Sequence, residues 1–144
     1  MPQRMLSDVV AGQDLLQAGP KATVMEAVKQ MDARNVAAIL VIEQSKLVGI
    51  FTERDLLKRV VAKGRNPTAT KLADAMTPNP ITISATAKPI DAIRTMQEHG
   101  FRHLPVADGG KVVGIVSLRD FVGDEIVAFE REANFREHLW EKSW

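Results

Sequence analysis

A pattern of seven residues that could form a binding site occurs twice in this chain of 144 residues. It consists of Gly, two hydrophobic residues, Thr or Ser, a variable residue, Arg and Asp, at residues 49–55 and 114–120. Where a strand runs into a helix, this order places a hydroxyl, a guanidinium and a carboxylate beside the free N–H groups of the helix N-terminus. The carboxylate can accept hydrogen bonds from a ribose diol, while the Arg and the N–H groups can bind phosphate. The pattern therefore suits a nucleotide.

The same residues also have a purely structural interpretation. Thr52 and Ser117 are good N-cap residues, and Asp55 and Asp120 are favoured near the positive end of a helix. Because a duplication copies helix caps as faithfully as it copies a binding site, the repetition alone does not decide between the two interpretations.

A second candidate lies at residues 101–106, which read Phe-Arg-His-Leu-Pro-Val. Arg102 and His103 bring up to two positive charges to the edge of the core, whereas the matched residues of the first half are Ala37 and Ala38. This difference would make one cavity bind phosphate better than the other. The structural alternative is a solvated Arg and a His that is hydrogen-bonded to a neighbouring carbonyl.

Both candidates belong to a repeat of about 60 residues. Residues 46–57 (KLVGIFTERDLL) and 111–122 (KVVGIVSLRDFV) align without a gap, 65 positions apart, and the same offset pairs Met31 with Met96. Each copy is predicted to run strand, helix, strand, strand, helix. A copy of this length buries too little surface to be stable alone, so the two copies are expected to fold as one unit.

Local signals place the elements of the first copy. Thr23 is the expected N-cap of a helix that ends near Asn35, and the β-branched run 36–42 predicts a buried strand. Gln44 and Ser45 suit a hairpin turn into a strand over 46–51. The helix after Thr52 is expected to bury four side chains, namely Leu56, Leu57, Val60 and Val61.

The second copy and the flanking segments follow the same reasoning. Gly100 should end a helix over 91–99, and residues 108–110 (Asp-Gly-Gly) should form a turn. Short helices are expected over 71–76, between the copies, and over 5–15. A longer helix is expected over 124–144, with an apolar stripe of Ile126, Phe129, Ala133 and Trp140.

Composition and missing motifs exclude several classes of function. Without Cys there is no disulfide, thiolate nucleophile or Cys-ligated zinc, and a net charge of +1 gives no bulk attraction to nucleic acid or anionic membranes. The longest apolar run, 36–42, is far shorter than the roughly 20 residues that a bilayer crossing needs. The N-terminus lacks the apolar core of a signal peptide. We expect a cytoplasmic protein with no membrane or nucleic-acid partner.

Catalysis and metal binding are not expected either. His99 and His103 have the spacing of zinc ligands on a helix, but Gly100 and Pro105 interrupt any helix through them. The chain has no glycine-rich phosphate loop and no nucleophile elbow. No general base is placed beside a nucleophile, so no catalytic residue is assigned.

The doubled pattern, the Arg-His-Leu-Pro-Val strand and the Met-ending helices resemble a tandem pair of cystathionine β-synthase (CBS) domains, a Bateman module, in a stand-alone two-CBS protein. The resemblance covers residues 12–126. It implies an α+β fold in which two βαββα repeats, related by a pseudo-twofold axis, pack through their sheets into one module with added terminal helices. The expected division is an N-terminal helical segment (1–15), CBS domain 1 (16–63), a linker (64–79), CBS domain 2 (80–126) and a C-terminal helix (127–144).

The resemblance also implies two ligand clefts, each built crosswise from the hydroxyl and Asp pattern of one repeat and the strand starts of the other. One cleft would use Thr52, Arg54, Asp55, Thr82, Phe101, Arg102, His103 and Pro105. The other would use Ile115, Ser117, Arg119, Asp120, Gln17, Val36, Ala37 and Ala38.

The roles that the resemblance implies are specific. Asp55 and Asp120 would hold the ribose. The phosphates would be bound by Arg54, Arg102 and His103, and Ala37 and Ala38 would line the base. The chain departs from the family pattern at Gln17, where Thr is frequent, and at Leu40, where the second copy has Pro105. These departures bear on the first strand rather than on the carboxylates.

The implied function is a regulatory, ligand-sensing module that forms a homodimer and acts in signal transduction on another protein. Its ligand would be AMP, ADP or ATP, or another adenosyl compound such as NAD or S-adenosylmethionine, and none of these serves as a catalytic cofactor. The alternative is an interaction or dimerisation module with vestigial clefts that acts through a C-terminal helix carrying Phe129, Trp140 and Trp144.

Overall fold

A computed structural model describes residues 4–121, 123, 125–127 and 131. Two compact units make up the chain. We call Leu15–Pro80 the first-repeat unit, and Met1–Asp14 together with Ile81–Trp144 the second-repeat unit. Each unit combines one β-sheet with helices, which confirms the predicted α+β class.

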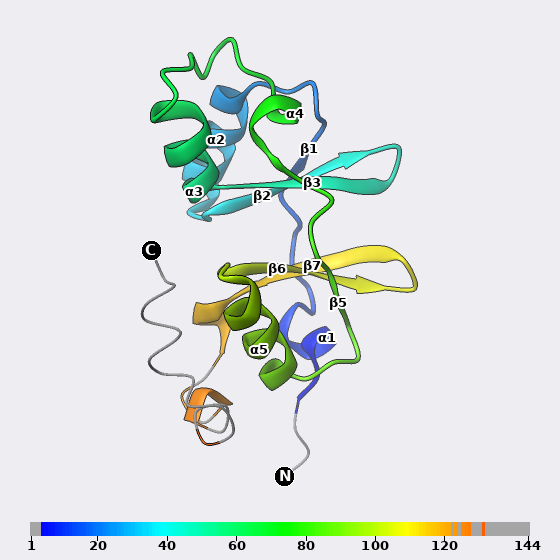
Figure 1. The fold of residues 1–144 in the computed structure, drawn as a ribbon. Helices are drawn as coiled ribbons and strands as arrows, with labels where there is room; N and C mark the ends of the chain where they lie inside the picture. Colours follow the sequence, from blue (N-terminus) through cyan, green and yellow to red (C-terminus); the bar gives the residue numbers. More distant parts are fainter. Residues whose placement is uncertain (1–3, 122, 124, 128–130, 132–144) are drawn as a thin grey trace. The chain divides into compact units, whose positions relative to one another are not determined.

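The first-repeat unit is built on a four-stranded sheet in the order β1-β2-β3-β4 (Figure 1). Strand β1 is parallel to β2, while β3 is antiparallel to both β2 and β4. Its elements in chain order are β1 (Gln17–Ala18), α2 (Val24–Arg34), β2 (Ala38–Glu43), β3 (Lys46–Thr52), α3 (Glu53–Asp55), η1 (Leu56–Val61), α4 (Leu72–Ala75) and β4 (Thr77–Pro78).

The second-repeat unit has a three-stranded sheet in the order β5-β6-β7. Its strands repeat the pairing of the first unit, and the register shifts after Val106 as it does after Val41, 65 positions earlier. This shared irregularity supports the duplication. The elements are α1 (Leu6–Val9), β5 (Ile83–Ser84), α5 (Pro89–His99), β6 (His103–Asp108), β7 (Lys111–Ser117) and the 3₁₀ turn η2 (Leu118–Asp120).

The predicted helix caps and turns are confirmed. The Thr23 hydroxyl accepts a hydrogen bond from the Glu26 N–H at 3.1 Å and so caps α2. Asn35 and Gly100 end α2 and α5 in the left-handed conformation, with φ of 53° and 71°. These features depend on residues only a few positions apart, which is why the sequence predicts them.

The helix after Thr52 buries less than expected. Val60 is fully buried and Leu56 packs against the core, but Leu57 and Val61 are 59% and 62% exposed. Residues 56–61 form a π-helix, in which each N–H bonds five residues back, as Ala62 does to Leu57. The wider turn directs Leu57 and Val61 away from the face that buries Leu56 and Val60.

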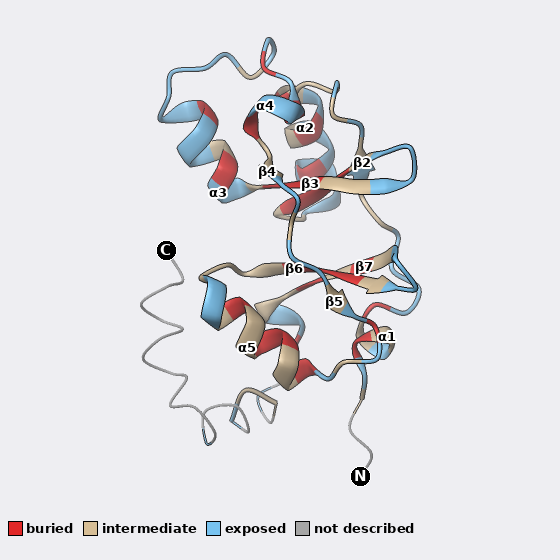
Figure 2. Cartoon of the chain, turned by 45° about the vertical axis from the view of Figure 1, so that its right-hand side comes forward, coloured by how far each residue is buried: buried red, intermediate tan, exposed pale blue. Residues whose placement is uncertain are grey.

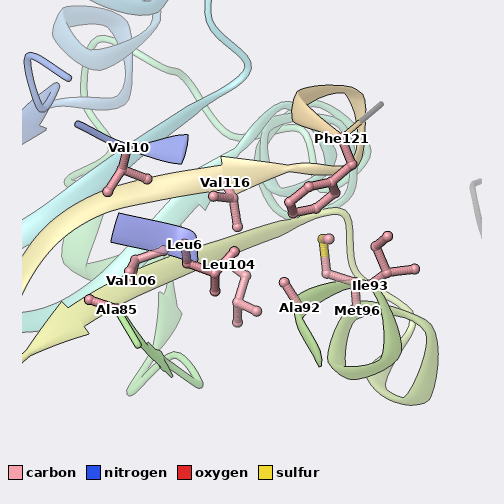
Figure 3. Packing of buried hydrophobic residues seen from close by; sticks show 10 residues of the cluster. All are labelled: Leu6, Val10, Ala85, Ala92, Ile93, Met96, Leu104, Val106, Val116 and Phe121. Atoms are coloured by element: carbon pink, nitrogen blue, oxygen red, sulfur yellow. The ribbon is translucent and has the colours of Figure 1, made fainter. Parts of the chain in front are cut away.

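Each unit has its own hydrophobic core beneath one face of its helix and sheet. Figure 2 shows the buried positions along the strands and along one side of α2 and α5. Figure 3 shows the core of the second-repeat unit, to which α5, β6, β7 and α1 contribute side chains. The cluster consists of Leu6, Val10, Ala85, Ala92, Ile93, Met96, Leu104, Val106, Val116 and Phe121.

Helices α1 and α4 occupy matching places in the two units. The N–H of Leu6 donates to the carbonyl of Ala87 at 2.8 Å, and the N–H of Leu72 donates to that of Ala22 at 2.8 Å. Both short helices are found where the sequence predicted helical segments, although α1 is shorter than 5–15. The N-terminal segment therefore completes the core of the second repeat.

The predicted C-terminal helix is described only in part. Residues 125–127 are helical, but Phe129, Ala133, Trp140 and Trp144 lie outside the described residues. In the part of the chain that is described, no helix has the length and apolar character that a bilayer crossing requires.

Candidate functional site

The two seven-residue patterns lie at strand-to-helix junctions, as predicted. Thr52 ends β3, and its backbone N–H donates to Asp55 Oδ2 at 2.9 Å while its Oγ1 accepts from the Asp55 N–H at 3.3 Å. At the end of β7 the Ser117 N–H donates to Asp120 Oδ2 in the same way, which is the carboxylate half of such a capping box. Both patterns thus cap helical turns, whatever else they do.

At the first junction the carboxylate is enclosed by its own unit. Asp55 is 8% exposed. Its second oxygen, Oδ1, accepts from the Thr77 hydroxyl at 3.0 Å and lies 3.4 Å from Arg59 Nε. Arg59 also donates from Nη1 to the carbonyl of Met76 at 2.9 Å. Asp55 therefore links the helix after β3 to the segment that carries β4.

At the second junction the carboxylate is open. Asp120 is exposed, and its Oδ2 accepts from the Ser117 N–H at 2.6 Å and faces the Ser117 hydroxyl at 3.4 Å. Its Oδ1 has no hydrogen-bond partner among the described residues. The backbone carbonyl of Asp120 accepts from Arg4 Nη2 at 3.1 Å, and Arg4 forms two further hydrogen bonds, of 2.9 and 2.7 Å, with the Glu125 carboxylate.

The Glu125 carboxylate is also the main reason why the pKa of Arg4 is raised above its usual value, since it accepts hydrogen bonds from the charged guanidinium. Arg4 thereby joins the N-terminal segment, the backbone of the second pattern and the start of the last helix. Arg4 was not predicted as a site residue, because its partners are more than 100 positions away along the chain.

Each pattern lies beside the start of the middle strand of its own repeat. The N–H of Glu53 donates to the carbonyl of Ala37 at 3.0 Å, and the N–H of Leu118 donates to that of Arg102 at 3.2 Å. The structure brings together two sets of predicted site residues. One set is Val36, Ala37, Ala38, Thr52, Arg54 and Asp55, and the other is Phe101, Arg102, His103, Ser117, Arg119 and Asp120.

His103 is neutral at neutral pH. Burial, followed by the positive charges of Arg102 and Arg119, lowers its pKa to about 4, while Asp120 acts in the opposite direction. Of the two charges expected at the start of β6, Arg102 carries one and His103 carries none at pH 7. The ring of the adjoining Phe101 stacks on His99 with centroids 5.4 Å apart.

The remaining predicted site residues lie farther along the sheets. Gln17 is exposed in β1 and pairs with Leu40, while Thr82 is exposed just before β5. Pro105 is buried and pairs with Ile115. The crosswise clefts join residues of both units and stay a prediction.

Besides Arg4, three residues that matter at these junctions were not predicted from the sequence. Arg59 stands four residues after Asp55 on a helix, a spacing at which ion pairs form, so this contact could have been found. Thr77 is 22 positions away from Asp55 and Gln13 is 102 positions away from Ile115, and no local signal reveals such pairs. Within the described ranges, no group of three or more His, Asp or Glu residues could hold a metal ion.

Comparison with known proteins places the chain in a family. A family model for the CBS domain matches residues 6–62 and 72–124. The chain is 37% identical, over 112 residues, to the CBS domain-containing protein CBSCBSPB2 of Arabidopsis thaliana, an alignment that covers 77% of this chain and 21% of that protein. The chain thus spans about a fifth of the length of that relative.

Solved structures show the same fold. A protein with CBS domains from Burkholderia ambifaria MC40-6 matches with a TM-score of 0.79 and 29% identity, over 86% of this chain and 95% of that one. The CBS domain protein PAE2072 from Pyrobaculum aerophilum, solved as a complex with AMP, matches with a TM-score of 0.79 over 89% and 99% of the chains. At 22% identity, the second match concerns the fold alone.

Tandem CBS modules are in general regulatory modules that bind ligands. The doubled strand, helix, strand, strand arrangement and the two matched segments agree with one another. The chain belongs to the CBS-domain family and contains two CBS domains in tandem.

Proposed function

We propose that this chain is a regulatory module that binds an adenine nucleotide and transmits that event to a partner protein. The candidate ligands are AMP, ADP and ATP, or another adenosyl compound such as NAD or S-adenosylmethionine. The observation that carries the proposal is the pair of hydroxyl and carboxylate patterns, each at a strand-to-helix junction with backbone N–H groups beside it.

The charges around the second pattern support a phosphate-bearing ligand. Arg102 and Arg119 lie close enough to His103 to lower its pKa, and the exposed Asp120 lies close enough to raise it. A guanidinium pairs well with phosphate, and a carboxylate accepts from a ribose diol. That the related Pyrobaculum aerophilum protein is a complex with AMP agrees with this class of ligand.

We propose signalling rather than catalysis. The candidate residues can hold a ribose and a phosphate, but His103 forms no hydrogen bond with a nucleophile in the described part of the chain. A ligand can then act only by binding two conformations with different affinity.

We also propose that two chains form a homodimer. The exposed apolar side chains Leu57 and Val61 on η1 support a protein contact. Light scattering should then give twice the chain mass of 15.9 kDa.

The direct test is to identify the small molecules that are bound to the purified protein. Small molecules released on denaturation are analysed by mass spectrometry, and calorimetry then measures binding of AMP, ATP, NAD and S-adenosylmethionine. The variant Asp55→Ala/Asp120→Ala should lose the bound compound. The matched control, Asp74→Ala/Asp108→Ala, changes one exposed Asp in each unit and should retain it.

Two results would contradict the proposal. The first is a protein that is empty and binds none of the four compounds. The second is unchanged nucleotide affinity in the Asp55→Ala/Asp120→Ala variant. Either result would favour the interaction module instead.

A further inference from the structure

The two matched carboxylates differ at one oxygen atom. Oδ2 of each has the same partners, because it accepts from the backbone N–H and the hydroxyl of Thr52 or Ser117. Oδ1 of Asp55 accepts from the Thr77 hydroxyl and faces Arg59, whereas Oδ1 of Asp120 has no partner among the described residues. Since the family pattern is intact in both copies, this difference comes from residues outside the pattern.

Thr77 and Arg59, the partners of Asp55 Oδ1, have no equivalent at Asp120 among the described residues. The position that matches Arg59 is Asp124, which carries the opposite charge. Thr77 reaches Asp55 because β4 pairs with β3 opposite Ile50. Ile115 of β7 matches Ile50, but its backbone groups pair with a side chain and not with a strand. The Gln13 amide donates to the Ile115 carbonyl at 3.0 Å and accepts from the Ile115 N–H at 2.7 Å.

We propose that the two carboxylates have different roles, and that Thr77 and Arg59 decide which of them takes the ligand. Asp120 accepts the ribose diol, while Asp55 is a structural link between the helix after β3 and β4. This inference rests on the proposed function, since it assigns the nucleoside to one of the two patterns.

The two carboxylates differ in the hydrogen-bonding capacity that they have left for a ribose. An ionised carboxylate has about four lone-pair sites. Thr52 takes two of them at Asp55 through its N–H and its hydroxyl, and Thr77 and Arg59 take the others. A ribose at Asp55 would have to displace Thr77 and Arg59, and Arg59 is itself held at the carbonyl of Met76. At Oδ1 of Asp120 a ribose would displace no side chain of the described residues.

The test pairs two nucleotides with matched variants of the full chain. Calorimetry measures AMP and 2′,3′-dideoxy-AMP, which lacks the diol, against the wild type, Asp120→Asn and Thr77→Val. Asp120→Asn should weaken AMP binding by about 10- to 100-fold, because a charge-assisted acceptor is lost, and should leave dideoxy-AMP binding unchanged. Thr77→Val should lower the thermal midpoint without weakening AMP binding.

Asp55→Asn adds a readout that needs no ligand. We expect it to lower the thermal midpoint more than Asp120→Asn does, because it breaks the link to β4. If Asp55→Asn or Thr77→Val weakens AMP binding as much as Asp120→Asn does, the assignment is overturned while nucleotide binding stands. If the wild type binds no nucleotide, the proposed function fails and the assignment fails with it. If Asp55→Asn does not fold, Thr77→Val alone decides.

Discussion

His103 shows how the surroundings of one residue set its chemistry. Its ordinary pKa of 6.5 is lowered to about 4, first by burial and then by Arg102 and Arg119. A neutral imidazole can donate or accept a single hydrogen bond but adds no charge. The positive charge beside His103 therefore comes from Arg102 and Arg119.

The lowered pKa predicts a pH dependence of stability. Between about pH 4 and pH 6.5 the unfolded chain binds the His103 proton and the folded chain does not, so the free energy of unfolding falls as the pH decreases through this window. From pH 7.5 to pH 5 the loss should be up to about 2 kcal/mol. Urea unfolding at the two pH values measures it.

His103→Gln should abolish this part of the pH dependence. His99→Gln, a change at an exposed His whose ring stacks on Phe101, is the matched control and should keep it. An equal pH dependence in His103→Gln and in the wild type would show that His103 is not buried in its neutral form.

At the scale of the elements, two glycines allow short helices to approach the sheets. Gly49 on β3 faces Met76 after α4, and Gly114 on β7 faces Val10 after α1. A Cβ added at Gly49 would lie 2.9 Å from Met76 Cγ and closer still to Met76 Sδ, and one added at Gly114 would lie 2.7 Å from Val10 Cγ1 and closer still to Val10 Cβ. Only the methionine side chain can move aside at low cost.

Gly114→Ala should therefore destabilise the protein more than Gly49→Ala. We expect a loss of about 1–3 kcal/mol for Gly114→Ala, typical of an overpacked core, and a smaller loss for Gly49→Ala. Chemical denaturation of both variants provides the comparison, and Val10→Ala should restore part of the stability of Gly114→Ala. Equal losses in the two glycine variants would contradict this explanation.

At the scale of the whole molecule, the chain does not divide where its repeats divide. The family matches begin at residues 6 and 72, so α1 opens the first match and α4 opens the second. In the structure, however, α1 belongs to the second-repeat unit and α4 to the first. Leu6 and Val10 are buried in the core formed mainly by α5 and its sheet.

Removal of residues 1–14 should consequently damage the second repeat rather than the first. The second-repeat unit would lose the core side chains Leu6 and Val10, and Leu6→Ala alone should cost about 2–5 kcal/mol. Hydrogen exchange should show lost protection in β6 and β7 and retained protection in β2 and β3. Full protection of β6 and β7 in the truncated chain would contradict the assignment of α1 to the second-repeat unit.

Much of the fold follows from short-range patterns. The caps at Thr23, Asn35 and Gly100 were predicted because each depends on a few neighbouring residues. The expectation that Leu57 and Val61 are buried was wrong, because the sequence does not reveal the π-helical winding of residues 56–61. The roles of the site residues in ligand binding stay predictions.

By itself, the sequence determined the duplication, the order of the elements and the two carboxylate patterns, because spacing along the chain carries all three. Only the tertiary structure decided that α1 completes the second repeat, and that Thr77 donates to Oδ1 of Asp55 while Oδ1 of Asp120 has no partner within the described ranges. These contacts join residues that are 22 or more positions apart. Strand pairing and core packing create such contacts, and neither leaves a local signal in the chain.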